Sequence, residues 1–598
     1  MKKIFAFVLA FLLLFSACST TNDPGTTPAP GTQTVTINPA AGFEKGSGTQ
    51  ADPYIISTPE ELMHLQISVN EQANTDYLHA WFRLEKDIDL QGTAWRAIGW
   101  TTDKQENPFT GVFDGAGHTI SNFHTTLEAT EDIGFRYMGL FFCLEGQISN
   151  LTVDRAYLHG DHINDVAGSI VAKLGFNGKV ENCAAGSNCD LSGATVGGIV
   201  GDSYGEIRNC ASAASVTGAA TTGHAGGIAG FHWKGALENC ANSGTVVGMQ
   251  NAGGIAGSLM GCALNCANAG SVNGAKTAGG VVGNLLQNPT ANEHNFTDLS
   301  LANCSNAGTV ESDQTAGGVI GHLSISGVGE ITVNNCSNAG NITGLSNLGG
   351  IIGSVTSRAA ARVNLLVCAN SGDLTALPQI FTTLGGIVGT LTCSSGEQIE
   401  LVQCTNEGTL SSDTGYAGGI LGAYSGVLAG AEDTVSLTFS ACSNSGAVSG
   451  GSRATGGIAG FVSGKNPPSV NLRLDHCINN ASVTAMAAGG IAGGILGVLE
   501  PTHASALLSY CNNTGAIATL EAELSEADEA FGFHVPLGGM IGLLGLSSVH
   551  LDPAATCTGG AVVFEACQNQ GSLVQNDDGQ IFHLGDTVGL AQMSYQEK

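Results

Sequence analysis

Cysteine is the residue type with the greatest chemical potential in this 598-residue sequence, because a thiolate can act as a nucleophile, bind zinc or form a disulfide. Of the 18 cysteines, twelve recur at one position of a repeated unit: Cys183, Cys210, Cys240, Cys266, Cys304, Cys336, Cys368, Cys404, Cys442, Cys477, Cys511 and Cys567. Equivalent positions of stacked repeats lie above one another, and a small, soft side chain suits a narrow core. We therefore expect most of these thiols to be buried and free. A disulfide ladder is the alternative, because the interstrand spacing lies within the Cα range of disulfides.

Cysteines outside this register are the better candidates for disulfides. Export to an oxidising compartment would permit bridges, and three pairs contain one partner that is off the repeat: Cys183/Cys189, Cys262/Cys266 and Cys393/Cys404. The spacing of Cys262 and Cys266 could also begin a zinc site, but no second Cys or His pair follows at zinc spacing. We therefore expect no metal and no other cofactor.

The repeat reads Cys-x-Asn-x-Gly and is followed by Gly-Gly-Ile/Val-x-Gly. Asn tolerates a left-handed corner, and its amide can bond the equivalent Asn of the next coil. The glycine pair allows neighbouring turns to approach closely. A phosphate loop is excluded, because no Lys-Ser/Thr pair and no helix follow the glycines. We therefore expect structural roles for the residues of the clearest copies: Cys240, Asn242, Gly244, Gly253, Gly254, Cys304, Asn306, Gly308, Gly317, Gly318, Cys336, Asn338, Gly340, Gly349 and Gly350.

Acid–base chemistry would need paired carboxylates about 5–10 Å apart in a groove. The candidates are Asp87, Asp89 and Asp114, and we interpret them as turn and strand-end residues. Three histidines recur near glycine blocks without matched acids at a constant register: His224, His232 and His322. No catalytic residue is therefore assigned.

Short strands must position these residues, because no segment of a unit keeps a 3.6-residue period long enough for a helix. Runs with period two, such as residues 331–336, are broken by Gly and Asn. Three short strands per unit predict an all-β chain that folds as a parallel β-helix of roughly twelve or more coils. A β-propeller is the main alternative, but its blades carry longer strands with more aromatic residues.

The N-terminus has the features of an export signal. Residues 1–17 combine Lys2 and Lys3 with an apolar stretch, and Phe15-Ser16-Ala17-Cys18 resembles the lipobox of bacterial lipoproteins. That resemblance implies cleavage before Cys18 and acylation of this residue, so the acyl chains are the expected membrane anchor. Residues 18–45 are rich in Thr, Pro and Gly and are expected to form a disordered tether. The formal charge of −30 argues against nucleic acid as a partner.

Residues 46–180 are expected to form a cap and the first coils, followed by regular coils over residues 181–595. Thr58-Pro59-Glu60-Glu61 predicts a capping box at the start of a helix, which would cover the open end of the stack. The series Thr58-Pro-Glu-Glu-Leu62, Asp87-Ile-Asp-Leu90, Phe113-Asp-Gly-Ala-Gly-His118 and Gly139-Leu-Phe141 resembles bacterial surface proteins with GLUG repeats, whose motif is similar to the Gly-Gly-Ile/Val-x-Gly blocks.

The resemblance spans about residues 46–595 and implies a right-handed β-helix with an adhesive role. Some relatives are IgA-cleaving metallopeptidases with a His-Glu-x-x-His zinc domain, a motif that this sequence lacks. We therefore expect a cell-envelope lipoprotein, in the outer membrane or on the cell surface, that acts as a non-catalytic binding, adhesion or spacer module. Its expected ligand is a glycan or a host or cell-surface protein. The alternative is a carbohydrate-active enzyme, a polysaccharide lyase or glycosidase.

Ligand contacts are expected on the loops that vary between units, since solenoids commonly carry function on one such face. The long variable segments cover residues 285–301, 425–435, 518–536 and 546–564. Tolerated surface loops are the other interpretation of the same segments.

Overall fold

The structure is a computed structural model, and every structural statement below concerns the residues that it describes. These are residues 36–71, 75–100, 107–125, 136–287, 298–378, 381–426, 434–450, 453–463, 469–486, 491–500, 504–520, 535–544, 561–572, 582–585, 588–591 and 596–597. Cys18 lies outside them. In the described part of the chain, no helix is both long enough and apolar enough to cross a membrane.

The chain divides into two compact units. The first comprises Met1–Met249, Gly254–Gly257 and Asn265–Gly270, and the second comprises Gln250–Gly253, Ser258–Leu264 and Ser271–Lys598. Strands of the coil pattern stack both before and after residue 180.

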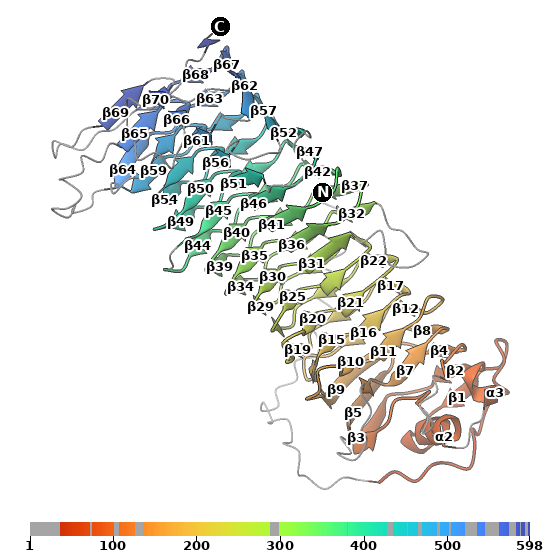
Figure 1. The fold of residues 1–598 in the computed structure, drawn as a ribbon. Coiled ribbons are helices and arrows are strands. Elements are labelled where there is room, and N and C mark those ends of the chain that lie inside the picture. Colours follow the sequence, from red (N-terminus) through yellow and green to blue (C-terminus); the bar gives the residue numbers. More distant parts are fainter. Residues whose placement is uncertain are drawn as a thin grey trace. The chain divides into compact units, whose positions relative to one another are not determined.

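The first unit begins with the expected capping helix. Helix α2 (Pro59–Asn70) has Thr58 as its N-cap, and the Thr58 hydroxyl and the Glu61 carboxylate satisfy each other's backbone N–H groups. The predicted capping box is therefore confirmed. A second short helix, α3 (Thr75–Leu78), follows, and both lie beside β1 (Tyr54–Ile56) and β2 (Trp81–Leu84) at the red end of the ribbon (Figure 1).

The C-terminal part of the expected tether is packed instead of extended. Ile37 is buried, the Ala40 N–H donates to the Glu60 carbonyl, and the Phe43 ring stacks on Tyr54 at 4.7 Å. Large apolar side chains at Ile37 and Phe43 explain the difference, because they can bury area that the preceding Thr/Pro/Gly segment cannot.

Parallel strands stack into columns in the first unit. The column used below runs through β7 (Phe141–Leu144), β11 (Val171–Leu174), β16 (Val200–Ser203) and β21 (Ala229–His232). The neighbouring column runs through β6 (Tyr137–Met138), β10 (Val166–Gly168), β15 (Thr195–Gly197) and β20 (His224–Gly226). Strands β12 (Lys179–Glu181), β17 (Glu206–Arg208) and β22 (Ala236–Glu238) belong to a third column.

One coil of the second unit consists of five short strands: β37 (Glu330–Asn334), β38 (Ser337–Asn338), β39 (Ile342–Gly344), β40 (Asn347–Gly349) and β41 (Ile352–Ser357). Each pairs in parallel with its equivalent in the next coil, as in Ile331↔Val363 and Ile352↔Val388. The expectation of three strands per coil is therefore wrong. The glycine pair interrupts a strand instead of lying within it, and a two-residue strand at the Asn was not foreseen.

The described residues contain four strands of the β40 type in the first unit and ten in the second. The chain is thus all-β with long stacked parallel sheets, and the predicted parallel β-helix is confirmed. Inward-facing Val, Ile and Leu fill the coils, as at Ile331, Val333 and Ile342, which are fully buried. Such burial stabilises the stack by roughly 1.5–3 kcal/mol per large side chain.

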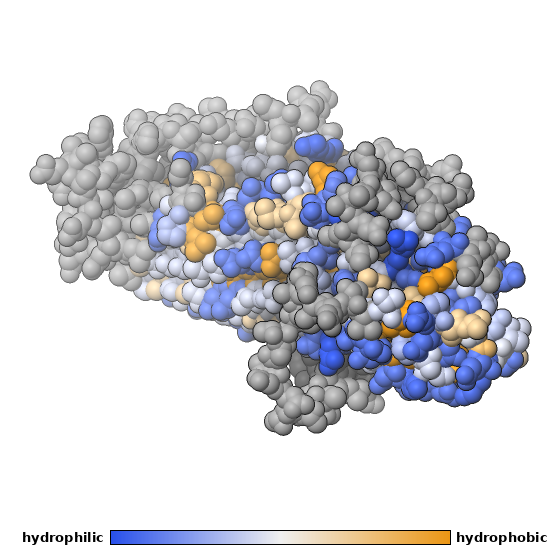
Figure 2. Space-filling view, turned by 90° about the horizontal axis from the view of Figure 1, so that it is seen from below, coloured by the Kyte–Doolittle hydropathy of each residue, from blue (hydrophilic) through white to orange (hydrophobic). Residues whose placement is uncertain are grey.

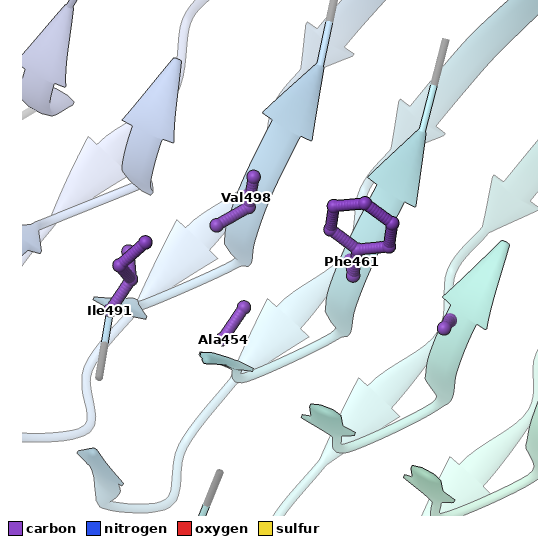
Figure 3. Packing of buried hydrophobic residues seen from close by; sticks show 5 residues of the cluster. Ala454, Phe461, Ile491 and Val498 are labelled. Carbon is purple, nitrogen blue, oxygen red and sulfur yellow. The ribbon is translucent and has the colours of Figure 1, made fainter. Parts of the chain in front are cut away.

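A smaller apolar cluster of the second unit lies outside this main core. It joins Phe461 of β56 (Ala459–Ser463), Val498 of β61 (Leu496–Glu500), Ala454 of β55 (Ala454–Gly456), Ala423 and Ile491 (Figure 3). These side chains come from strands on either side of the glycine blocks. Two neighbouring columns therefore pack against each other at that corner.

Candidate functional site

The repeated asparagines form a buried amide ladder. The Nδ2 of Asn306 donates to Oδ1 of Asn338 at 2.8 Å, and the Nδ2 of Asn338 donates to Oδ1 of Asn370 at 2.8 Å. Each Nδ2 also donates to the carbonyl two residues later, Gly308 or Gly340, at 2.8 Å. Asn338 is 1% exposed. The ladder suggested by the sequence is therefore present, and its amides are occupied within the stack.

The first clear copy has the same local geometry. Asn242 donates to the Gly244 carbonyl at 2.9 Å and to Oδ1 of Asn268 at 2.9 Å, and Cys240 is buried beside it. Gly253 ends β25 (Asn251–Gly253), and Gly254 follows as the second glycine of the block.

The glycine pairs pack closely against the amide ladder and against neighbouring backbone. A Cβ on Gly317 would meet the Ile320 carbonyl at 1.9 Å, and a Cβ on Gly318 would lie 2.1 Å from the Gly350 carbonyl and 2.3 Å from Cγ of Asn338. Gly349 and Gly350 repeat both contacts one coil later. The Cys-x-Asn-x-Gly and Gly-Gly motifs are thus one interlocked structural unit.

All sixteen cysteines among the described residues have free thiols. Cys336 is typical: its buried Sγ donates to the Asn334 carbonyl at 3.5 Å and to the Leu301 carbonyl of the preceding coil at 3.7 Å, and Cys304 makes the equivalent contacts. Burial raises the pKa of the Cys189 thiol to about 12. A protonated thiol is a poor nucleophile and a poor metal ligand, so Cys189, which lies outside the repeated register, is chemically inert at neutral pH.

The three off-register disulfide candidates are wrong. Neither Cys183/Cys189, Cys262/Cys266 nor Cys393/Cys404 is bridged. The thiols instead face carbonyls of separate strands: Cys183 Sγ donates to Glu181, Cys189 to Val153, Cys266 to Leu237 and Cys404 to Leu365. Their direction is set by the strand register and not by proximity in sequence.

The acidic candidates of the N-terminal region stabilise turns. Asp89 Oδ1 accepts from the Gln91 N–H at 2.7 Å, and Asp114 Oδ1 accepts from the Ala116 N–H at 2.9 Å. Asp87 Oδ1 accepts from the Thr119 N–H at 2.9 Å, with His118 Nδ1 3.2 Å away. These contacts fit the structural interpretation made from the sequence.

Asp114 also ends an exposed amide row that the sequence interpretation missed. Asn150 donates to Asp114 Oδ1 at 2.9 Å, Asn182 to Asn150 at 3.2 Å, and Asn209 to Asn182 at 3.1 Å. These asparagines have φ near 55° and, from Asn182 on, directly precede the repeated Cys. The Asn-Cys dipeptide was the available signal, because Asn is one of the few residues that tolerate this left-handed corner.

The histidines are dispersed. His232 is 0% exposed and its Nδ1 lies 3.0 Å from Ser203 Oγ, so this pair inside the coils is closed to substrate. Burial lowers the pKa of His232 and of His322 to about 4. His322 lies in the second unit beside Ser354, at 3.1 Å. Among the described residues, no group of three or more His, Cys, Asp or Glu is placed to hold a metal ion.

Four aromatic rings interrupt the small-residue pattern of the first unit. The Phe231 and Trp233 rings stack at 4.0 Å, Tyr204 is parallel to Trp233 within 3° at 5.6 Å, and Phe176 lies 5.0 Å from Tyr204. His224 of β20 meets the Phe231 ring edge-on at 5.2 Å. We call Phe176, Tyr204, Phe231 and Trp233, with Lys173, Asp202 and Lys234, the aromatic face.

Charged groups accompany these rings. The Trp233 indole N–H donates to Asp202 Oδ1 at 2.6 Å, and Lys173 pairs in register with Asp202 on the neighbouring strand. Burial raises the pKa of the Asp202 carboxyl to about 6, with Trp233 and Lys173 acting in the opposite direction. The Lys234 ammonium lies 5.6 Å from the centre of the Phe176 ring. Rings, a carboxylate and ammonium groups therefore meet on one surface.

The strand register explains why these residues gather. Lys173, Asp202 and Phe231 occupy equivalent outward positions of β11, β16 and β21. Tyr204 and Trp233 stand two residues further along, on the same side. This surface was not predicted from the sequence. Phe231-His-Trp233 after a glycine block was the usable signal in a chain with 6% aromatic residues.

The variable segments proposed as ligand-binding loops lie largely outside the described residues. The parts of these segments that the structure does not describe are residues 288–297, 427–433, 521–534 and 545–560. On the part of the surface that Figure 2 colours, hydrophilic residues surround small groups of hydrophobic ones.

No protein-family model matches the chain. Halomucin from Haloquadratum walsbyi is 31% identical over 164 residues, which cover 26% of this chain, and the chain spans 2% of that relative's length. A crystal structure from Bacteroides ovatus, provisionally assigned as an immunoglobulin A1 protease, is 19% identical with a TM-score of 0.31. The likeness covers 58% of this chain and 85% of that one, and at this TM-score no role is taken from it.

Proposed function

We propose that the chain is an exported lipoprotein of the bacterial cell envelope, anchored through Cys18, whose GLUG-type β-helix serves as a non-catalytic binding module. The observation that carries the proposal is the contrast between the repeat and the aromatic face. The repeated Asn and Cys groups are occupied inside the coils, whereas the rings at Phe176, Tyr204 and Trp233 interrupt the repeat on its outer side.

The contacts of Asp202 favour binding over catalysis. A glycosidase places two carboxyl groups about 5–10 Å apart, and each then influences the pKa of the other. The groups that shift the pKa of Asp202 are its burial, Trp233, Lys173 and the Ser203 backbone, and no second carboxylate is among them. A polysaccharide lyase or glycosidase is the alternative, and the assay with soluble polysaccharides described below tests it.

Lipid anchoring is tested by metabolic labelling with an alkyne fatty acid. Cells that express the full chain are compared with cells that express Cys18→Ala. We expect the label on the wild-type chain and none on the variant, because thioether and amide acylation both need a cysteine at the mature N-terminus. Equal labelling of both chains would contradict the proposed anchor.

Binding is tested by adhesion of cells that display the chain to surfaces coated with polysaccharides or with cell-surface proteins. We expect more adhesion than for cells without the chain, and equal adhesion on every surface would contradict a binding role. Soluble polysaccharides incubated with the same cells test catalysis, since shortening of the polymer would contradict the non-catalytic assignment.

A further inference from the structure

We propose that the aromatic face binds a linear carbohydrate polymer, with successive sugar rings lying along successive coils. This inference rests on the proposed function, because it names the ligand class of the same binding module.

The spacing of the rings along the coils matches a sugar polymer. Phe176 follows β11, Tyr204 follows β16 and Trp233 follows β21, so each of three successive coils contributes a ring, and the third coil adds Phe231 beside Trp233. The ring centres are 5.0 Å apart for Phe176 and Tyr204 and 5.6 Å apart for Tyr204 and Trp233. This interval follows from the parallel strand separation of about 4.8 Å. It is close to the length of one pyranose unit in an extended polysaccharide.

Phe176, at one end of the row, is exposed to solvent. Phe176 is 53% exposed, and its ring is tilted by 54° from Tyr204, so it does not continue the parallel stack formed by Tyr204 and Trp233. The face of an aromatic ring carries negative charge density. The C–H bonds on one face of a pyranose carry partial positive charge and pack against such a ring. Phe176 is therefore the expected stacking platform.

Two charged groups, Asp202 and Lys234, lie beside the rings. A carboxylate accepts strong hydrogen bonds from hydroxyl groups, and Asp202 stands beside Trp233 with one oxygen engaged by the indole. Lys234 lies over Phe176, where its ammonium can bond a hydroxyl or pair with the carboxylate of an acidic sugar. Both neutral sugars and uronic acids share the ring and hydroxyl chemistry that this surface recognises.

A globular protein is the less suitable ligand. Specific protein–protein interfaces bury about 800 Å² on each partner and involve about 20–30 residues a side. The aromatic face is instead a narrow row of rings at one-coil intervals, with Phe231 stacked beside Trp233. A row of this kind is complementary to a linear polymer with a short repeat.

The test uses the full-length lipoprotein purified in detergent micelles and oligosaccharides of one to six sugars, followed by calorimetry. One series is a neutral β-1,4-glucan and the other is a uronic acid polymer. We expect binding of at least one series, with affinity rising at least tenfold from one sugar to three, because a longer chain also contacts the rings and charged groups of the next two coils. Phe176→Ala should weaken binding at least tenfold, and Phe176→Trp should retain it.

The matched control is Phe381→Ala. Phe381 is 42% exposed, contacts the Tyr416 ring at 5.2 Å and has the Arg453 guanidinium 5.4 Å from its centre, but it belongs to the second unit. The affinity of the Phe381→Ala variant for the oligosaccharide should stay within twofold of the wild-type value.

Three results would overturn the inference: no binding of either series, equal affinity for one and three sugars, or unchanged affinity in Phe176→Ala. If the displayed chain adheres only to a protein-coated surface, the glycan inference fails while the binding role stands. If it adheres to no surface, the proposed function itself fails.

Discussion

Asn338 uses both ends of its side-chain amide within the β-helix. It donates to Gly340 and Asn370 and accepts from Asn306 and the Gly340 N–H, at 2.8 to 3.3 Å. Removing it leaves neighbouring buried groups unsatisfied, at roughly 1–3 kcal/mol for each group. We therefore expect Asn338→Ala to lower the free energy of unfolding by about 3 kcal/mol, measured by urea denaturation.

The control for this change is Ser337→Ala, since Ser337 is exposed on the same strand. Its expected effect is within about 0.5 kcal/mol. Because stacked repeats can unfold in segments, hydrogen exchange of residues 330–357 should show where protection is lost. Equal losses in the two variants would mean that the amide ladder contributes little.

Asp202 makes the free energy of unfolding depend on pH, and its raised pKa fixes the sign of this dependence. Its pKa rises from the ordinary 3.8 to about 6 in the folded chain, so folding favours the protonated carboxyl. The stability that Asp202 contributes to the folded chain is fully present below pH 4 and is lost as the pH rises through 6. The difference of 6 − 3.8 = 2.2 pKa units corresponds to at most about 3 kcal/mol.

Asp202→Asn imitates the protonated side chain and should keep the hydrogen bond from Trp233. We expect the stability of the variant relative to wild type to increase between pH 4 and pH 7, by up to about 3 kcal/mol. Denaturation of both proteins across this range measures the difference, which also cancels the titration of the histidines. A pH-independent difference would contradict the assigned burial.

At the scale of elements, the glycine block decides how two neighbouring columns meet. Gly318→Ala would place a Cβ 2.1 Å from the Gly350 carbonyl, which cannot move without disturbing the next coil. Overpacking of a filled core costs roughly 1–3 kcal/mol, and backbone on both sides puts this site at or above the upper end. We expect a loss of about 3 kcal/mol or more in the free energy of unfolding.

Gly42→Ala is the matched control, because a Cβ on Gly42 would meet nothing within 4 Å. Its stability should be unchanged or slightly higher, since alanine restricts the unfolded chain. If Gly318→Ala were equally harmless, close approach would not be the reason for glycine in the repeat.

The elements also show how far the sequence could be interpreted. Period-two runs and the Thr58 capping box are local signals, and both led to the correct structures. The five-strand coil was not predictable in the same way, because the break between β40 and β41 depends on contacts such as that of Gly318 with Asn338. The aromatic face requires the register Lys173↔Asp202↔Phe231, which depends on the lengths of whole coils.

At the scale of the whole molecule, the thiols combine burial with an expected route through an oxidising compartment. Among the described residues, fourteen cysteines are buried and two, Cys262 and Cys567, are half-buried. Disulfide chemistry needs a thiolate and access, and burial raises the pKa of Cys189 and Cys393 well above the ordinary value. Folding before oxidation would therefore protect these two thiols through their raised pKa and the buried thiols of the repeat through lack of access.

Alkylation without reductant tests this arrangement. In the folded protein we expect Cys262 and Cys567 to react first, and the buried thiols to react only as their coils open locally. After unfolding in denaturant, mass spectrometry should find all sixteen described thiols alkylated. Alkylation of fewer than half of these thiols would show that the ladder is oxidised. In that case the stability of the stack would depend on covalent bridges instead of on the amide ladder and the glycine contacts that surround each thiol.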